Sequence, residues 1–276
     1  MPRNFRPLLV LCPVLLLAAC NNTPAPPAGN IPPEAALTQG TGLAEDGRGD
    51  GYEYHVRYPE LDPEWTALNR ALRSYAGQRI QVLLAAVGAA GERSPNAEPV
   101  VLDLEFNVAR RTEDFVSVLA QGSLREPGKT EPLAAAFVLH AQDKRLLAIT
   151  DLFADPAAAL HALSAECARQ LDGRFEASLR QSIADAKTLA TTLKTMQDGV
   201  AHGTAPQAEN FAVFLVDGID SKAIGLTLFF AQAQLGVGSG GEQQVEVPAK
   251  VFYELLKPEF RAAFSVDVKE LAAGAH

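Results

Sequence analysis

The chain has 276 residues, of which 47% are hydrophobic and 21% charged, and 33 acidic residues outnumber 24 basic ones to give a formal net charge of −9. This charge disfavours binding to nucleic acid or to anionic lipid, because both are themselves negative. A chain of this length can close a large hydrophobic core by itself, so we expect a globular domain.

The N-terminal segment has the pattern of a secretion signal. Arg3 and Arg6 precede the apolar run LLVLCPVLLLAAC, which is too short to span a bilayer stably but suits the core of a signal peptide. The run ends in Leu-Ala-Ala-Cys, which resembles a bacterial lipobox. We therefore expect residues 1–19 to be a lipoprotein signal peptide and Cys20 to be lipidated; the alternative is an ordinary signal peptide in which Cys20 is incidental.

A lipidated Cys20 implies a membrane address. One acyl chain binds membranes only weakly, at about 10⁴ M⁻¹, so lasting anchorage needs several chains such as palmitate. Asn21 is not the Asp that retains lipoproteins at the inner membrane. We expect an outer-membrane lipoprotein that faces the periplasm, with the inner membrane and the cell surface as alternatives.

Processing at Cys20 would also change charge and thiol content. Loss of residues 1–19 removes Arg3 and Arg6, which leaves 22 basic against 33 acidic residues and a charge of about −11. Such a surface would steer cationic partners toward the protein, although acidity can also serve solubility alone. Cys167 would be the one remaining free thiol, and its helical spacing with Leu163 and Leu171 predicts a buried, inert side chain.

The remaining chain divides into a linker and one folded domain. Residues 20–50 are rich in Pro, Gly and Ala without apolar periodicity, which indicates a disordered tether. Residues 51–276 indicate a single α+β domain, with a mixed or antiparallel sheet packed by helices and the option of two lobes. In chain order we expect a strand at 52–58, a helix capped by Asp62 that runs from 63 to about 87, a strand at 99–111 and a hairpin of 115–124 with 132–141. Helices at 156–171 and 175–196, strands at 210–218, 223–230 and 243–248, and a short helix after Pro248 follow.

The last third of the chain carries a family resemblance. A Phe-rich strand, a glycine-rich turn, the sequence Val-Glu-Val-Pro at 245–248 and a short helix follow one another. Together with YEYHVRYPEL at 52–61 and the LFADP turn after residue 151, this order resembles the RsiV-type extracytoplasmic domain. That family includes a lysozyme-sensing anti-sigma factor and secreted relatives of unknown function.

The resemblance implies a binding module and a binding loop. Candidate loop residues are Phe230, Gln234, Gly236, Gly238 and Gly241. Phe230, Gln234 and Gly241 match the family pattern, whereas Ala233, Val237 and Gly238 replace the expected Tyr, Pro and Tyr. The implied partners are a cationic protein such as lysozyme, or peptidoglycan.

No pattern in the sequence predicts a catalytic site, a metal site or a cofactor. Gly236 to Gly241 satisfy G-x-G-x-x-G, but a strand follows where a dinucleotide site needs a helix. Ser239 lacks the first glycine of a nucleophile elbow, and the histidines lie apart from one another. We therefore expect no enzyme. Two alternatives stay open: an envelope hydrolase with a scattered site that includes His140 or His202, and a structural lipoprotein without a ligand.

Overall fold

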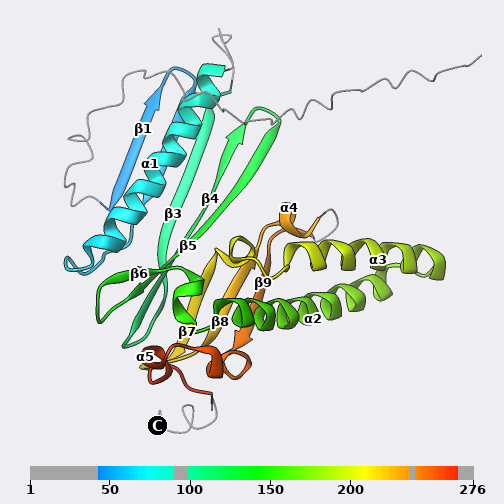
Figure 1. The fold of residues 1–276 in the computed structure, drawn as a ribbon. Helices are drawn as coiled ribbons and strands as arrows, with labels where there is room; N and C mark the ends of the chain where they lie inside the picture. The colour runs from blue at the N-terminus through cyan, green and yellow to red at the C-terminus, as the bar shows by residue number, and fades with distance from the viewer. Residues whose placement is uncertain (1–42, 90–97, 237–239, 267–276) are drawn as a thin grey trace, which may run out of the picture. The chain divides into compact units, whose positions relative to one another are not determined.

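Figure 1 shows the fold of the chain as a computed structural model, which describes residues 43–89, 98–236 and 240–266. The predicted signal peptide, Cys20 and Gly238 lie outside these residues. The described part forms one α+β domain with two sheets, as the sequence predicts.

The larger sheet has six strands in the order in which they occur along the chain. Strands β2 and β3 are parallel and are joined through helix α1, whereas all other neighbours are antiparallel. Helix α1 covers one face of the sheet (Figure 1). The bounds are β1 (Ala44–Gly49), β2 (Tyr52–Arg57), α1 (Thr66–Ala89), β3 (Val100–Arg111), β4 (Phe115–Glu126), β5 (Lys129–His140) and β6 (Arg145–Leu147).

Strand β1 corrects the predicted start of the folded domain. Its residues AEDGRG lie within the segment 20–50 that the sequence predicts as tether, so 44–49 of that segment form a strand of the folded domain. The strand has almost no apolar side chains and depends instead on its neighbour β2. Asp46 pairs with Arg57 at 2.6 Å and Arg48 with Glu53 at 2.8 Å. Cross-strand ion pairs of this kind carry no hydrophobic signature in the sequence.

The smaller sheet has three antiparallel strands, and helices α2 and α3 cover one of its faces (Figure 1). Its inward side chains and those of the helices form the second hydrophobic cluster of the domain. Cys167 is fully buried in this cluster, which confirms its predicted burial. The bounds are α2 (Pro156–Ser182), α3 (Ala186–Gly203), β7 (Phe214–Ile219), β8 (Lys222–Phe230), α4 (Gln232–Leu235) and β9 (Gln243–Pro248).

The end of α2 and both ends of α3 differ from the prediction. Helix α2 passes through Gly173 and ends at Ser182. A Cβ atom added at Gly173 would face open space, so no neighbouring group interrupts the helix there. Asp185 then caps α3 by accepting a hydrogen bond from the Thr188 nitrogen at 2.7 Å. Helix α3 continues to Gly203, so His202 lies in its last turn and not in a loop.

The short segments around the second sheet are mostly turns. Four 3₁₀ turns occupy Ile149–Leu152, Ala208–Phe211, Ala249–Val251 and Tyr253–Leu255, and the last helix is α5 (Pro258–Arg261). The helix predicted after Pro248 is therefore replaced by a series of short turns. Pro258 occupies the first turn of α5, where its missing backbone donor is tolerated, and it separates α5 from the turns before it.

Candidate functional site

The predicted binding loop separates into residues with different environments. Phe230 is fully buried and packs edge-on against Phe211, with ring centroids 6.0 Å apart. It therefore belongs to the core and does not contact a ligand, which corrects the sequence-based assignment. Gly236 follows α4 with a φ of 88°, a conformation that favours glycine.

Gln234 holds α4 in place. Its side-chain amide donates to the carbonyl oxygens of Gly203 at 2.8 Å and Asn210 at 2.9 Å. Both amide protons are therefore used to attach α4 to the end of α3 and to the turn that follows it. Gln234 acts as a positioning residue, not as a donor to a ligand.

Two glycines of α3 allow this close approach. A Cβ atom at Gly199 would lie 2.2 Å from the carbonyl oxygen of Leu235, and one at Gly203 would lie 2.6 Å from that of Gln234. Because both neighbours are backbone atoms, no larger side chain fits without displacement of α4. The spacing G-x-x-x-G at 199–203 is the sequence signal for this contact.

A cavity of about 520 Å³ lies beside α4, and we call it the α4 cavity. Its walls come from four parts of the chain: Tyr75 and Arg79 of α1, residues 131–134 of β5, Val213 before β7, and residues around α4, namely Phe229, Ala231, Gln232, Gln234, Gly241 and Glu242. Gln234 and Gly241 of the predicted loop line it. Its volume is within the range of small-molecule sites, which is roughly 300–1,000 Å³.

Arg79 is the basic residue among those that line the α4 cavity. Its guanidinium carbon lies 5.1 Å from the centroid of the Tyr75 ring, a cation–π arrangement. The Nε atom is buried and has no hydrogen-bond partner among the residues that the structure describes. A buried donor without a partner costs free energy, so an acceptor that reached this N–H would be favoured.

Two carboxyl groups complete the polar lining. Glu131 forms an ion pair with Lys129 at 3.2 Å, which offsets its charge. Partial burial raises the pKa of the Glu242 carboxyl above its ordinary value. The cavity therefore combines one guanidinium with carboxyl groups that accept or donate hydrogen bonds, and Gln232 adds an exposed amide at its rim.

Tyr75 and Arg79 are the site residues that sequence reasoning does not identify. They continue the apolar stripe of α1 that includes Leu68 and Leu72, and an arginine on such a stripe is the available signal. The signal is weak by itself, because long arginine side chains often cover apolar surface.

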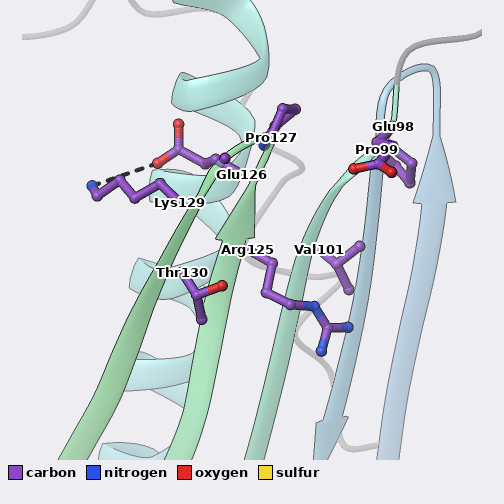
Figure 2. Close-up of a pocket in the computed structure, with 9 residues that line it drawn as sticks. Glu98, Pro99, Val101, Arg125, Glu126, Pro127, Lys129 and Thr130 are labelled. Atoms are coloured by element: carbon purple, nitrogen blue, oxygen red, sulfur yellow. Dashed lines mark ion pairs between the residues drawn. The ribbon is translucent and has the colours of Figure 1, made fainter. Parts of the chain in front are cut away.

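A second cavity, of about 410 Å³, lies beside the turn between β4 and β5 of the larger sheet. Figure 2 shows its lining between the start of β3, at Glu98 to Val101, and the hairpin turn from Arg125 to Thr130. Arg125 pairs with Asp103 at 2.7 Å and Lys129 with Glu126 at 3.7 Å. These charged groups neutralise one another at the surface, so this cavity offers a ligand fewer unpaired polar groups than the α4 cavity does.

The two histidines considered for hydrolysis lie apart from these cavities. Nδ1 of His140 lies 2.8 Å from the Asp143 carboxylate, and its ring packs against Phe260 with centroids 5.2 Å apart. His202 is exposed at the end of α3. Neither residue lines the α4 cavity or the cavity of Figure 2.

The described residues provide neither a reactive thiol at Cys167 nor a cluster of metal ligands. Burial raises the pKa of the Cys167 thiol to about 12, so the sulfur stays protonated and weakly nucleophilic near neutral pH. Within residues 43–89, 98–236 and 240–266, no three His, Cys, Asp or Glu side chains gather closely enough to hold a metal ion. In the same ranges, no helix has both the length and the apolar character needed to cross a membrane.

Comparison with known proteins finds similarity at the level of solved structures. No family model and no curated protein matches the chain. A DUF3298 family protein from Pseudomonas aeruginosa PAO1 has a TM-score of 0.48 and 16% identity, covering 82% of this chain and 95% of that chain. A DUF3298 family member from Bacteroides fragilis NCTC 9343 has a TM-score of 0.47 and 11% identity, covering 79% and 92%. We transfer no function from either protein.

Proposed function

We propose that this protein is an RsiV-like envelope lipoprotein whose domain binds cell-wall glycan in the α4 cavity. The observation that carries the proposal is the buried, unpartnered Nε of Arg79 in a cavity of about 520 Å³. The proposal treats the domain as a binding module and assigns it no catalytic step.

The polar groups of the α4 cavity suit peptidoglycan chemically. Peptidoglycan carries carboxylates, amides and many hydroxyl groups. A guanidinium binds a carboxylate through charge-assisted hydrogen bonds, and Arg79 already has an N–H without a partner. Glu242 and Gln232 supply further donors and acceptors at the same cavity, which sugar hydroxyls and amides can use.

The size of the site favours a glycan over a folded protein. A stable protein–protein interface buries roughly 800 Å² on each partner and is normally broad. The α4 cavity is instead a concave site bordered by α1, β5 and α4. A cationic lysozyme-like hydrolase remains the second candidate, on the separate observation that acidic residues outnumber basic ones by 33 to 24.

The envelope address is part of the proposal and rests on the N-terminal sequence. The Leu-Ala-Ala-Cys signal at 17–20 supports lipidation of Cys20, with the domain held at the outer membrane and facing the periplasm. Mass spectrometry of the membrane-purified protein tests this assignment. We expect an N-terminal peptide that begins with acylated Cys20, and an unmodified Cys20 would contradict it.

Calorimetric titration with soluble peptidoglycan fragments tests the binding function. We expect the wild-type protein to bind, and Arg79→Gln to lose at least about tenfold in affinity, as removal of a charged hydrogen bond predicts. Arg73→Gln is the matched control, because Arg73 lies on the same helix, 4.7 Å from the Tyr58 ring, and does not line the cavity.

Three results would count against the proposal. Absence of binding by the wild-type protein would contradict it, and so would equal losses from Arg79→Gln and Arg73→Gln. Release of new reducing ends from the fragments would indicate a hydrolase instead. Binding of lysozyme that weakens with salt, without binding of glycan, would favour the cationic partner.

A further inference from the structure

Asp217 is a largely buried carboxylate at an irregular point of β7. Its side chain is 15% exposed. The antiparallel register between β7 and β8 shifts between Asp217 and Gly218, so a β-bulge changes the direction of the strand at this position. The hydroxyl of Thr227, itself 1% exposed, donates a hydrogen bond to Oδ2 of Asp217.

The second oxygen of this carboxylate is incompletely bonded. Oδ1 of Asp217 is buried and has no hydrogen-bond partner within the described ranges of the chain. Its nearest opposite charge is Nε of Arg110 on β3, at 3.4 Å, a distance that allows attraction but not a good hydrogen bond. The Arg110 side chain is half-exposed, and its Nη1 donates a hydrogen bond to the carbonyl oxygen of Ala109 at 2.7 Å.

Asp217 and Arg110 line a cavity of about 450 Å³ that is separate from the α4 cavity, and we call it the Asp217 cavity. Glu246 of β9 places a second carboxylate in its wall. Ile224 and Pro248 supply apolar surface. The cavity therefore presents two carboxylates, one guanidinium and a small apolar wall.

We propose that the Asp217 cavity binds a free α-amino acid with a small apolar side chain. The ligand ammonium would displace Arg110 from Oδ1 of Asp217 and also pair with the carboxylate of Glu246, and the ligand carboxylate would take Arg110. The side chain would face Ile224 and Pro248. This site is independent of the glycan site, because the two cavities share no lining residue.

Charge balance favours a zwitterion over simpler ligands. In the free protein, Asp217 and Arg110 partly neutralise one another. A zwitterion exchanges that weak pair for two charge-assisted contacts, and the net charge of the cavity does not change. A lone anion would face two carboxylates, and a lone cation would leave Arg110 without its partner.

Calorimetry on the full-length protein can separate these ligands. The probes are L-valine and D-valine, with isovalerate, which lacks the ammonium group, and isobutylamine, which lacks the carboxylate. We expect at least one valine enantiomer to bind in the millimolar range or tighter, and each single-charge analogue to bind at least about tenfold more weakly.

Variants assign the binding to the cavity. Asp217→Asn and Arg110→Gln should each weaken valine binding at least about tenfold. Matched controls are Asp220→Asn, an exposed Asp in the same hairpin, and Arg111→Gln, whose guanidinium lies 5.0 Å from the Trp65 ring; both should bind as the wild type does. If circular dichroism shows that Asp217→Asn is unfolded, Glu246→Gln provides the test, because Glu246 is exposed.

Several outcomes would overturn the proposal. They are absence of binding by both valine enantiomers, equal binding of isovalerate or isobutylamine, and unchanged binding in folded Asp217→Asn or, in its place, in Glu246→Gln. None of these outcomes bears on glycan binding at Arg79, so failure here and failure of the proposed function remain distinguishable.

Discussion

The hydroxyl oxygen of Ser117 lies 3.0 Å from the backbone nitrogen of Val216 and 3.4 Å from the carbonyl oxygen of the same residue. Ser117 belongs to β4 of the larger sheet, and Val216 belongs to β7, the edge strand of the smaller one. An edge strand presents backbone groups that need partners. One buried hydroxyl supplies both partners and joins the two sheets.

Ser117→Ala should therefore destabilise the protein. The substitution leaves the buried N–H of Val216 without its acceptor, so we expect the free energy of unfolding to fall by about 1–3 kcal/mol. Urea denaturation followed by circular dichroism measures this loss. Ser178→Ala, at an exposed position of α2, is the control and should change stability by less than about 0.5 kcal/mol. Equal effects of the two substitutions would refute the role of Ser117.

Alanine substitutions at two pairs of helix glycines should change the stability of the protein in opposite directions. Gly199→Ala or Gly203→Ala places a methyl group against the backbone of α4, so we expect lower stability and weaker glycan binding. Gly77→Ala and Gly173→Ala meet open space on α1 and α2, so they should stabilise by about 0.5–1 kcal/mol. Thermal melting of the four variants checks the order, and destabilisation by all four would show that the contact with α4 is not the cause.

Substitution of Gln234 should lower stability, whereas substitution of Gln232 should weaken glycan binding. Gln234→Ala removes the two hydrogen bonds that attach α4, so we expect a loss of about 1–3 kcal/mol in stability. Gln232→Ala changes an exposed side chain at the rim of the cavity and should weaken glycan binding with little effect on stability. Paired denaturation and titration experiments measure both quantities. The assignment fails if Gln234→Ala is as stable as the wild type.

Asp217 should make stability depend on pH. Burial raises the pKa of its carboxyl group above the ordinary value of 3.8, and the charge of Glu246 acts in the same direction, while Thr227 and Arg110 oppose it. The folded state thus favours the protonated form, so this stabilising contribution is complete below pH 3.8 and is lost as pH rises through the raised pKa.

Asp217→Asn tests this linkage because it removes the titrating group at nearly constant shape. Relative to the wild type, we expect the variant to gain stability at neutral pH and to gain less near pH 3.8. Denaturation curves at the two pH values give the difference. Asp220→Asn, at an exposed turn position, should show no such pH-dependent gain. A variant that loses stability equally at both pH values would argue against a raised pKa.

Most of the fold follows from hydrophobic alternation. Val100, Leu102, Leu104 and Phe106 alternate with polar residues along β3 and are buried as that pattern predicts. Val108 continues the pattern but is 39% exposed, because the register with β4 shifts between Val108 and Arg110. Strand β1 could not be predicted in this way, because its glycines lie under the rings of Tyr52 and Tyr54 and its charges pair across the strands. The continuation of α2 through Gly173 is also not predictable from local sequence, because glycine is common at helix ends.

The site was less predictable than the fold. Gln234 and Gly241 do line the α4 cavity, but Phe230 points into the core, and its burial depends on Phe211. Arg79 and Glu242 come together only through tertiary packing, since more than half of the chain separates them. Local spacing carries no information about such a contact. Sequence patterns therefore indicate the segment beside the cavity but not the basic residue that lines it.

The Nε–Hε resonance of Arg79 reports most directly on the central claim, that the α4 cavity is a binding site. Two-dimensional ¹⁵N NMR during titration with soluble peptidoglycan fragments would follow this proton, which has no acceptor within the described part of the free protein. We predict a saturable shift of the Arg79 resonance, while that of Arg73 on the same helix stays unchanged. An Arg79 resonance that does not move while the fragments bind elsewhere, or an absence of any shift, would contradict the account.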